Sequence, residues 1–469
     1  MSFMPVILWS DALVFLLLAT GIAATWYVRQ REHLLLPWRR VAKSRVAMVS
    51  LLVLSLFFAV GLLDTLHYRA VLPEKNADGV VYSSEVLSVF DKLVTPLRLN
   101  TEKTYSAPLA ISLYAKETIT DAQGKVLREF PRLKFGGVHL ADESQRDIDV
   151  AKRSLMGALG GLLIAWLLIG AVKVLGKLYR TYAGAASPSA PPQAPPFSEG
   201  ERSRVIFIAT LIIATLIGIT INLASFYHVL GTDKVGQDIL YLSLKSIRTG
   251  LIIGTVTTLV TLPIGVILGI AAGYFRGWID DVIQYIYTVL SSIPGVLLIA
   301  AAVLIMQMTI EMHAEWFDTA ASRADLRLVF LCLILGMTSW TGLCRLLRGE
   351  TLKLREMEYI QAAQSFGVSS MRILISHIMP NVMHIILIAL VMDFSGLVLA
   401  EAVLSYVGVG VDPSMISFGT MINGARLEMG REPMVWWALA SAFCFMLVLV
   451  LAANLFSDTV RDAFDPRLN

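Results

Sequence analysis

Charged residues are scarce in this chain of 469 residues. Asp, Glu, Lys and Arg make up 16% of it, against about 25% in ordinary soluble domains. Residues of the set AVILMFWYC make up 56%, and long apolar stretches carry no charge at all. This combination excludes a disordered chain, a coiled coil and a single water-soluble domain. We therefore predict an integral membrane protein.

Cysteine is also rare, and the short motifs of catalysis are missing. The three cysteines, Cys332, Cys344 and Cys444, lie within apolar runs and form no CxxC pair. They indicate neither a disulfide framework nor a zinc site. The seven histidines are scattered and no H-E-x-x-H or G-x-S-x-G sequence occurs, so we expect no catalytic residue, no bound metal and no enzyme activity. The net charge of +3 is too small to indicate a nucleic-acid partner.

Nine apolar runs are long enough for membrane-spanning helices, which need roughly 20 residues each. The first run is followed, not preceded, by basic residues (Arg29 and Arg31), the wrong order for a signal peptide, so we expect it to be retained. Pro263 and Pro294 lie inside two runs and are candidates for kinks. The expected fold class is an all-α polytopic membrane protein, with spans at about residues 13–28, 46–63, 154–176, 205–223, 247–273, 282–308, 326–347, 382–409 and 435–456.

The distribution of basic residues predicts the orientation in the membrane. Residues 29–45 carry six basic residues and one acidic residue, and residues 348–372 contain four more basic residues, so both segments are expected in the cytoplasm. Six spans lie between them, an even number, so the two assignments agree. The N-terminus is then outside and the C-terminus cytoplasmic. Residues 64–153, with thirteen basic and thirteen acidic residues, lie outside.

The chain divides into a front part and a rear part. Residues 1–63 hold two spans, residues 64–153 a small α/β extracytoplasmic (periplasmic) domain, and residues 154–176 the third span. Residues 177–204 contain five prolines and read as an extended cytoplasmic linker or, less simply, as a ligand for a partner. Residues 205–469 hold six spans.

The extracytoplasmic domain shows local strand and helix signals. Residues 110–119 and 125–130 flank the sequence Asp121-Ala-Gln-Gly124 and predict a β-hairpin with a short turn. Residues 84–93 are a candidate short helix. The sequence leaves two functions open for this domain, a spacer or a docking surface for an extracytoplasmic partner.

The loop at residues 349–381 is the most informative stretch. Residues 356–366 predict a short helix that ends at Gly367, the residue best able to take a left-handed conformation. Either Ser369 or Ser370 can cap a second helix. We expect Pro380 to stop that second helix after His377.

Small and polar residues in this loop carry a family resemblance. Gln361-Ala362-Ala363, Gly367 and His377-Ile378-Met379-Pro380-Asn381 resemble the EAA loop of ATP-binding-cassette (ABC) importer permeases. Gln361 stands where that family usually has Glu, which keeps the length of the side chain and loses its charge. Acidic residues that can compensate lie nearby, at Glu350, Glu356 and Glu358.

Four further stretches extend the resemblance to residues 198–469. The sequence Leu230–Leu240 resembles the stretch that follows the first core span in dipeptide and oligopeptide permeases, through Gly231, Thr232, Asp233, Gly236 and Asp238. Residues 271–280, residues 400–410 and residues 461–467 match as well. The resemblance therefore covers a six-span core, and the first three spans and the extracytoplasmic domain lie outside it.

The resemblance implies an ATP-driven importer in the bacterial cytoplasmic (inner) membrane. This chain would form half of the translocation pathway, with a second homologous permease, two cytoplasmic ABC ATPases and an extracytoplasmic substrate-binding protein as partners. The chain has no G-x-x-x-x-G-K-[ST] sequence, so ATP and Mg are expected on the ATPases and no cofactor on this chain. The binding protein would dock near residues 231–239 and 412–431. The residues expected to couple to the ATPases are Glu358, Gln361, Ala362, Ala363, Gly367, His377, Pro380 and Asn381.

Other features of the core leave alternatives open. Asp393 and Glu401 lie in an apolar run and either line the passage or serve in packing. Gly265, Gly269 and Gly273 form a small-residue series suited to close helix packing or to gating. A peptide is the substrate that the resemblance favours. The alternatives are a related permease for nickel complexes or glutathione, an ion-coupled secondary transporter, or a scaffolding role for the front spans alone.

Overall fold

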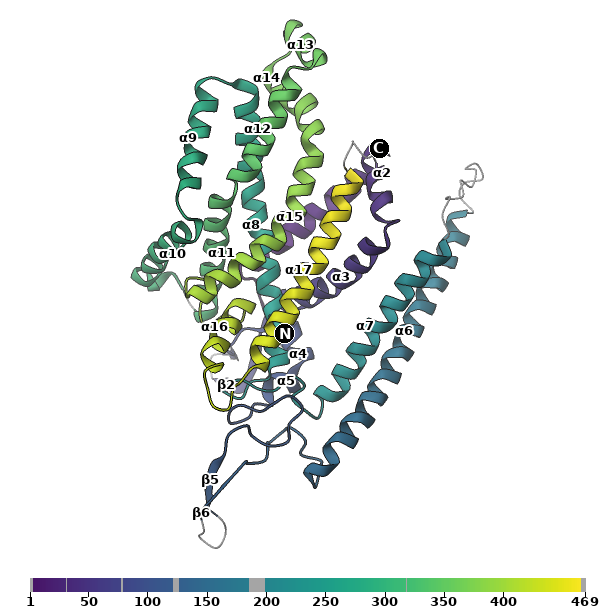
Figure 1. The fold of residues 1–469 in the computed structure, drawn as a ribbon, viewed down its shortest axis with the longest axis vertical. Helices are drawn as coiled ribbons and strands as arrows, with labels where there is room; N and C mark the ends of the chain where they lie inside the picture. The colour runs from purple at the N-terminus through teal and green to yellow at the C-terminus, as the bar shows by residue number, and fades with distance from the viewer. Residues whose placement is uncertain are drawn as a thin grey trace.

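The computed structural model describes residues 3–30, 32–76, 79–120, 126–184, 199–317 and 319–464. Within this part of the chain, nine helical stretches are long and apolar enough to cross a membrane. Each overlaps one predicted run, so the polytopic helical fold is confirmed, with short strands gathered at one end (Figure 1). The nine stretches are Trp9–Arg29, Arg45–Thr65, Glu143–Ala171, Arg204–Ala224, Ile239–Phe275, Gly295–Met312, Ala320–Arg355, Ser370–Val407 and Trp437–Phe464.

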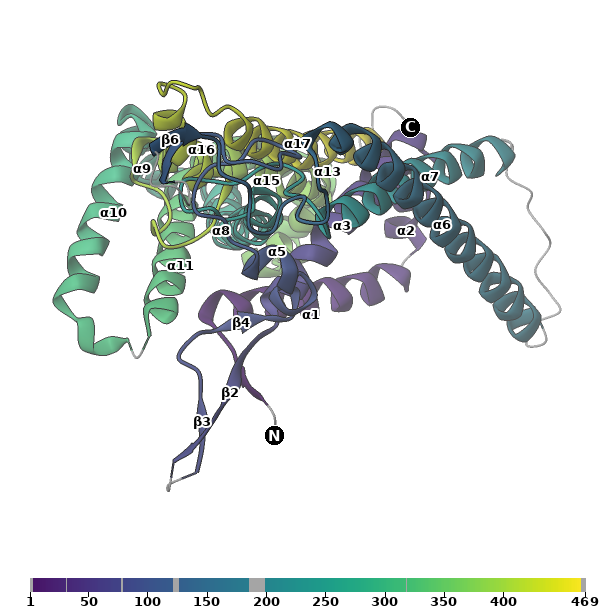
Figure 2. The same ribbon diagram turned by 90° about the horizontal axis from the view of Figure 1, so that it is seen from below.

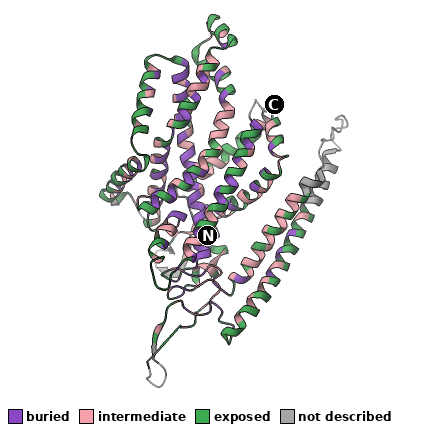
Figure 3. Ribbon diagram, viewed as in Figure 1, coloured by how far each residue is buried: buried purple, intermediate pink, exposed green. Residues whose placement is uncertain are grey.

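The long helix α8 (Ile239–Phe275) is the centre of the bundle and continues without a break through Pro263. Figure 3 shows buried residues along α8, whereas α6 is mostly exposed and α7 is mostly of intermediate exposure. The helices packed around α8 are α3 (Arg45–Thr65), α11 (Ala320–Ser339), α12 (Thr341–Arg355), α15 (Met379–Val407) and, over a shorter contact, α17 (Trp437–Phe464).

Small residues set the close contact between α8 and α12. A Cβ atom added at Gly269 would lie 2.8 Å from the carbonyl oxygen of Cys344. At Gly273 it would lie 2.8 Å from the carbonyl oxygen of Arg348, and at Gly265 it would meet a side chain of α12 at 3.0 Å. Backbones approach this closely only where side chains are absent. The packing use predicted for this glycine series is therefore confirmed.

The sixth predicted span is wrong as a single helix. Residues 282–308 are divided between α9 (Trp278–Ser292) and α10 (Gly295–Met312), which run in different directions (Figures 1 and 2). Ile293 has extended dihedral angles, with φ −89° and ψ 132°. The cause is Pro294, because a proline ring disfavours the helical conformation in the residue before it.

Helices α6 (Arg146–Gly184) and α7 (Glu199–Ala224) form a pair that stands beside the bundle (Figure 1). A Cβ atom added at Gly157 of α6 would lie 2.6 Å from the carbonyl oxygen of Gly218 of α7. The predicted linker at residues 177–204 is shorter than expected, because both of its ends are helical and only its middle lies outside the described residues. The first proline of that segment is at position 188, so none interrupts the end of α6.

Short strands join the N-terminus to the domain at residues 64–153, which we name the inserted domain. β1 (Phe3–Val6) pairs antiparallel with β2 (His67–Asn76), and this pairing was not predicted. β2 also pairs with β3 (Gly79–Tyr82) and with β4 (Leu87–Ser88). The first two spans are thus tied together at this end by main-chain hydrogen bonds.

The predicted hairpin is confirmed. β5 (Glu117–Thr120) pairs antiparallel with β6 (Val126–Glu129), and the turn between them lies outside the described residues. The helix expected at residues 84–93 is shorter, since α4 covers Val89–Leu93 and is followed by α5 (Thr95–Leu99). Strands and short helices together make the small α/β domain that was expected.

The two ends of the bundle carry different elements (Figure 1). The short helices α13 (Glu358–Ser365) and α14 (Ser370–Ile373) form the tip of one end, here named the loop end. Helix α2 (Glu32–Val41) and the C-terminus lie toward the same end. The inserted domain and α16 (Phe418–Glu428) lie at the opposite end, named the insert end. Which end faces the cytoplasm stays a prediction.

Candidate functional site

The loop-end helix α13 stops as the sequence predicts. Gly367 has a φ of +73°, the left-handed conformation expected of it. The Gly367 amide donates to the carbonyl of Gln364 at 3.0 Å, and the Val368 amide donates to the carbonyl of Ala363 at 3.1 Å. These two bonds are the pattern of a Schellman motif, which ends a helix by using its last free carbonyls.

One face of α13 is anchored in the bundle. Ile360 is fully buried and belongs to a cluster contributed by α8, α12, α14 and α15. Ala363 and Val368 are partly buried against the same cluster. The other members are Ile270, Tyr274, Leu343, Leu347, Ile373, Ile378 and Val382. A displacement of α13 is therefore transmitted to these helices by close packing.

The opposite face of the loop end exposes large apolar side chains. Phe366 is 87% exposed, and Met357, Met371 and Ile375 are also exposed. Among the predicted coupling residues, Glu358, Gln361, Ala362 and Gly367 are exposed beside them. We name Met357, Phe366, Met371 and Ile375 the loop-end patch. Sequence reasoning missed these four residues, although Phe366, directly before the predicted cap Gly367, was a usable signal.

Polar contacts brace the neutral residue Gln361. Its side-chain amide donates to the carbonyl oxygen of Glu356 at 3.3 Å. Glu356 forms an ion pair with Arg276, and Glu350 forms one with Lys353 at 2.9 Å. Among the described residues, Glu358 has no ion-pair partner and is exposed, so it is the acidic side chain of this loop that remains open to a partner protein.

A bidentate ion pair holds α9 against α12 near the loop end. Arg348 donates to the two carboxylate oxygens of Asp280 at 2.6 Å and 2.7 Å. The hydrogen bonds from Arg348 hold the pKa of Asp280 below its usual range, against the opposing effect of burial. This pair fixes the base from which the loop projects.

The predicted stop at Pro380 is wrong. The segment Leu374–Ile378 forms a π turn, and the helix continues through Pro380 into α15. A π turn bonds residues five apart, and this wider spacing accommodates a proline that lacks a donor. The Asn381 side-chain amide donates to the carbonyl of His377 at 2.6 Å and to the hydroxyl of Tyr359 at 3.2 Å, which links α15 to α13.

The family-like stretch at the insert end is covered by the inserted domain. The Thr232 hydroxyl accepts a hydrogen bond from the Ser106 amide at 2.7 Å and donates one to the Thr104 carbonyl at 2.9 Å. Gly231 and Gly236 have φ of +75° and +77°. A Cβ atom at Gly231 would lie 2.5 Å from the Ser106 carbonyl oxygen, and one at Gly236 would collide with the carbonyl of Glu102.

The acidic residues of this stretch have local partners. Asp238 caps α8, accepting hydrogen bonds from the amides of Leu240 at 2.8 Å and Tyr241 at 3.3 Å. Asp233 accepts from the amides of Val235 and Gln237 at 2.9 Å and 2.8 Å, which closes the loop. Asp238 is buried and fully engaged in this cap, whereas the Asp233 carboxylate is partly exposed.

His228 joins the core to the inserted domain. Its Nδ1 atom lies 2.7 Å from Asp238, and its Nε2 atom lies 3.5 Å from Glu102, whose carboxylate also accepts from the amides of Lys134 and Phe135. Burial lowers the pKa of His228, but the hydrogen bond to Asp238 and the nearby carboxylate of Glu102 outweigh it and raise the pKa to about 9. Burial likewise opposes the fall in the pKa of Glu102, which the neighbouring His228 and hydrogen bonds from the amides lower to about 2.

The second predicted docking segment, residues 412–431, also touches the inserted domain. The guanidinium of Arg431 lies 5.0 Å from the ring of Tyr105. Just beyond, Tyr114 donates to the Met434 carbonyl at 3.1 Å. The inserted domain thus covers Gly231, Thr232 and Gly236, whereas Lys234, Val235 and Gln237 are exposed, and docking of a binding protein near residues 231–239 stays a prediction.

The two acidic residues of α15 differ in their surroundings. Glu401 is 1% exposed, and its Oε1 atom accepts hydrogen bonds from Ser405 at 2.7 Å and Ser417 at 2.8 Å. These contacts tie α15 to the start of α16 and favour the packing role for Glu401. Asp393 is half-buried. Within the described residues, no group of His, Cys, Asp or Glu could hold a metal ion.

Comparison with known proteins gives one family model and several relatives. Residues 265–469 match the family described as "Binding-protein-dependent transport system inner membrane component". The chain is 34% identical over 239 residues to the oligopeptide transport system permease protein OppC of Mycobacterium tuberculosis, which covers 51% of this chain and 76% of that protein. It is 35% identical over 241 residues to the glutathione transport system permease protein GsiD of Pectobacterium atrosepticum. This match covers 51% of this chain and 73% of that protein.

A solved structure also matches. The inward-facing MetNI methionine ABC transporter has 15% sequence identity and a TM-score of 0.35, over 48% of this chain and 98% of that chain.

Proposed function

The chain belongs to the family of binding-protein-dependent transport system inner membrane components, the multi-pass permeases of ABC importers, and we propose that it couples to cytoplasmic ATPases through residues 349–381. In this proposal the chain forms half of a translocation pathway and a second homologous permease forms the other half. An extracytoplasmic substrate-binding protein delivers the substrate. The N-terminus then lies outside and the C-terminus in the cytoplasm.

The loop-end patch is the observation that carries the coupling proposal. Phe366, the residue directly after α13, is 87% exposed, and α13 forms the tip of the structure (Figure 1). Exposed aromatic side chains grouped with other apolar residues are typical of a surface that a partner protein covers. Gly367 leaves open space beside this surface, since nothing lies within 4 Å of an added Cβ atom.

The anchored face of α13 supplies the mechanical link. Ile360 packs among residues of α8, α12 and α15, so a push on the loop-end patch moves those helices together. ATP and Mg bind to the ATPases in this proposal, and the closing of the ATPase pair shifts the spans between inward-open and outward-open states. No cofactor is needed on this chain.

A peptide is the proposed substrate class. The two relatives are named for oligopeptide and glutathione transport. Glutathione is itself a small peptide, so one substrate class accommodates both names. The core alone does not separate long from short peptides, because selection in such a system rests largely with the binding protein.

The experiment is ATP-driven uptake by the purified transporter in lipid vesicles, with the ATPases and the binding protein present. Phe366→Ala is expected to weaken ATPase binding by about tenfold or more, the size typical of a lost aromatic anchor. Gly367→Trp is expected to abolish uptake while the chain still inserts and folds. Leu163→Ala, an exposed apolar residue of α6, is the matched control and should leave both unchanged. Uptake that continued without the ATPases would contradict the proposal.

A further inference from the structure

A polar stripe runs along the first three turns of α8. Tyr241, Lys245 and Arg248 are spaced four and three residues apart, so they lie on one face of the helix. Arg248 is buried, and Lys245 is largely buried. Charged side chains in a membrane-spanning helix are costly unless they are paired. The span predicted from the sequence starts later, at Ile247, so that prediction did not include the whole stripe.

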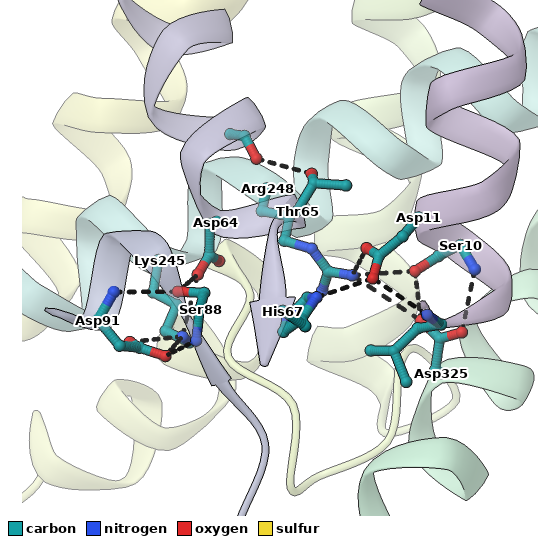
Figure 4. Close-up of polar contacts among 12 residues, drawn as sticks. Ser10, Asp11, Asp64, Thr65, His67, Ser88, Asp91, Lys245, Arg248 and Asp325 are labelled. Atoms are coloured by element: carbon teal, nitrogen blue, oxygen red, sulfur yellow. Dashed lines mark hydrogen bonds and ion pairs between the residues drawn. The ribbon is translucent and has the colours of Figure 1, made fainter. Parts of the chain in front are cut away.

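Acidic residues of the front part of the chain pair with the first half of the stripe (Figure 4). Lys245 Nζ lies 2.7 Å from both carboxylate oxygens of Asp91 in α4 and 3.1 Å from Asp64 at the end of α3. The Tyr241 hydroxyl donates to Asp91 at 2.8 Å. The Ser88 hydroxyl donates to Asp64 at 2.6 Å, which joins the two acids.

The second half of the stripe is paired by the beginning of α1 (Trp9–Arg29). Arg248 donates to Asp11 at 2.7 Å and to the Ser10 hydroxyl at 2.9 Å. The Ser10 amide donates to Asp325 of α11 at 3.0 Å, and its hydroxyl bonds to the same carboxylate. His67 Nδ1 lies 2.7 Å from Asp11. The beginning of α1 thus bridges α8 and α11, as Figure 4 shows.

The charges on the two sides are complementary and unequal. The core contributes Lys245, Arg248 and Asp325, and Asp325 lies 3.9 Å from Arg248. The front part contributes three carboxylates, on Asp11, Asp64 and Asp91. Without the front part, Lys245 would lose its two carboxylate partners and Arg248 would keep one distant partner. Removing one partner of a buried pair is strongly destabilising.

We infer that the front part is an obligate intramolecular partner of the permease core, docked on α8 and α11 by these ion pairs and kept there throughout transport. Close packing adds to the charge pairing. A Cβ atom at Gly61 of α3 would lie 2.5 Å from the side chain of Leu251 and 3.8 Å from the Cα atom of Arg248. The front part therefore acts as a fixed subunit of the permease, and its polar surface keeps lipid away from the stripe.

Two mutant pairs test this inference on the full-length transporter. Asp11→Asn and Asp91→Asn are each expected to lower the thermal midpoint, because Arg248 and Lys245 then lose their nearest carboxylates. Adding Arg248→Met together with Asp325→Asn to the first variant, and Lys245→Met together with Asp64→Asn to the second, should recover most of the loss, since these buried ion pairs are then removed with both of their partners. Asp147→Asn is the matched control, because the Asp147 side chain is 83% exposed, and it should leave the midpoint unchanged.

Turnover measured per folded transporter distinguishes ion pairs that stay closed throughout transport from ion pairs that open in each cycle. If the ion pairs stay closed, the single variants are less stable but have unchanged turnover. Turnover raised twofold or more in Asp11→Asn would overturn the inference, because it would mean that the ion pairs open in each cycle. Unchanged midpoints in both single variants would overturn it as well. The turnover arm rests on the proposed function, whereas the midpoints report docking even if the protein transports nothing.

Discussion

The Nδ1 atom of His228 lies 2.7 Å from the Oδ2 atom of Asp238, the residue that caps the central helix α8. The opposite nitrogen of the same ring faces Glu102 of the inserted domain at 3.5 Å. A single imidazole therefore joins the start of α8 to the inserted domain. Protonation of this imidazole allows both contacts, because only the charged ring has two donors.

The pH dependence of stability follows from this arrangement. The pKa of His228 is raised to about 9, so its contribution is fully present below the unfolded value of about 6.5 and is lost as the pH rises through about 9. The pKa of Glu102 is lowered to about 2, so its contribution is present above about 4.5 and is lost as the pH falls through about 2. Thermal midpoints of the purified protein should be highest between about pH 5 and 6.5 and should fall toward pH 9.

The control for the pH prediction is His228→Gln, which keeps a hydrogen-bonding group and removes the titration. Its midpoint should be lower at pH 6 and should lose most of the decline between pH 7 and 9. An equal alkaline decline in the variant and the parent would assign the effect to other groups.

Substitution of Gly236 should loosen the inserted domain. Gly236→Ala puts a Cβ atom into the carbonyl of Glu102 at a φ of +77°. Gly408→Ala is the matched control, since Gly408 is left-handed with a φ of +88° and nothing lies within 4 Å of its added Cβ atom. Backbone strain of about 1 kcal/mol is common to both, so a larger loss of thermal stability is expected for Gly236→Ala alone. Limited proteolysis of the inserted domain checks the same point, and equal behaviour of the two variants would contradict the close contact.

Loss of the Asp280–Arg348 pair should separate α9 from α12. Asp280→Asn removes a bidentate, charge-assisted contact of a mostly buried carboxylate, which costs about 1–3 kcal/mol. Arg348→Lys keeps the charge and loses the fork geometry, so it should be less stable than the parent as well. Asp281→Asn, an exposed neighbour, should change little. The measurement is the thermal midpoint, and a decrease of the same size in Asp281→Asn would refute the assignment.

Two adjacent glycines of α6 should differ sharply in their tolerance to substitution. Gly161→Val drives a side chain into the backbone of Ala214 in α7, whereas nothing lies within 4 Å of a Cβ atom added at Gly160. Gly160→Val shares the cost of a β-branched residue in a helix and is therefore the matched control. Only Gly161→Val is expected to separate the α6–α7 pair, seen as a lower thermal midpoint. Equal effects of the two substitutions would contradict the packing.

Features that depend on neighbouring residues were predictable from the sequence. Nine spans follow from composition over windows of about 20 residues. The cap at Gly367, the β5–β6 hairpin and the glycine series on α8 each follow from a short pattern whose cause is local. The exposed position of Ala362 also agrees with a loop built to meet a partner.

Features that depend on distant residues were not predictable. Ser106 and Thr232 are 126 residues apart, and nothing in either segment shows that the inserted domain covers the core stretch. The pairing of β1 with β2 is equally remote. The break at Pro294 was predictable from the proline itself. The prediction of one continuous span across it gave too much weight to apolar composition. At Pro380 the usual rule failed because a π turn precedes the proline.

The π turn at Leu374–Ile378 decides where the loop-end patch points. An α-helix turns by about 100° per residue, so one residue more or less in this segment would swing α13 and α14 about α15 by about that angle. Phe366 would then lie on a different side of α15. The orientation of the whole loop therefore depends on the one extra residue in the π turn, which lies just before Pro380.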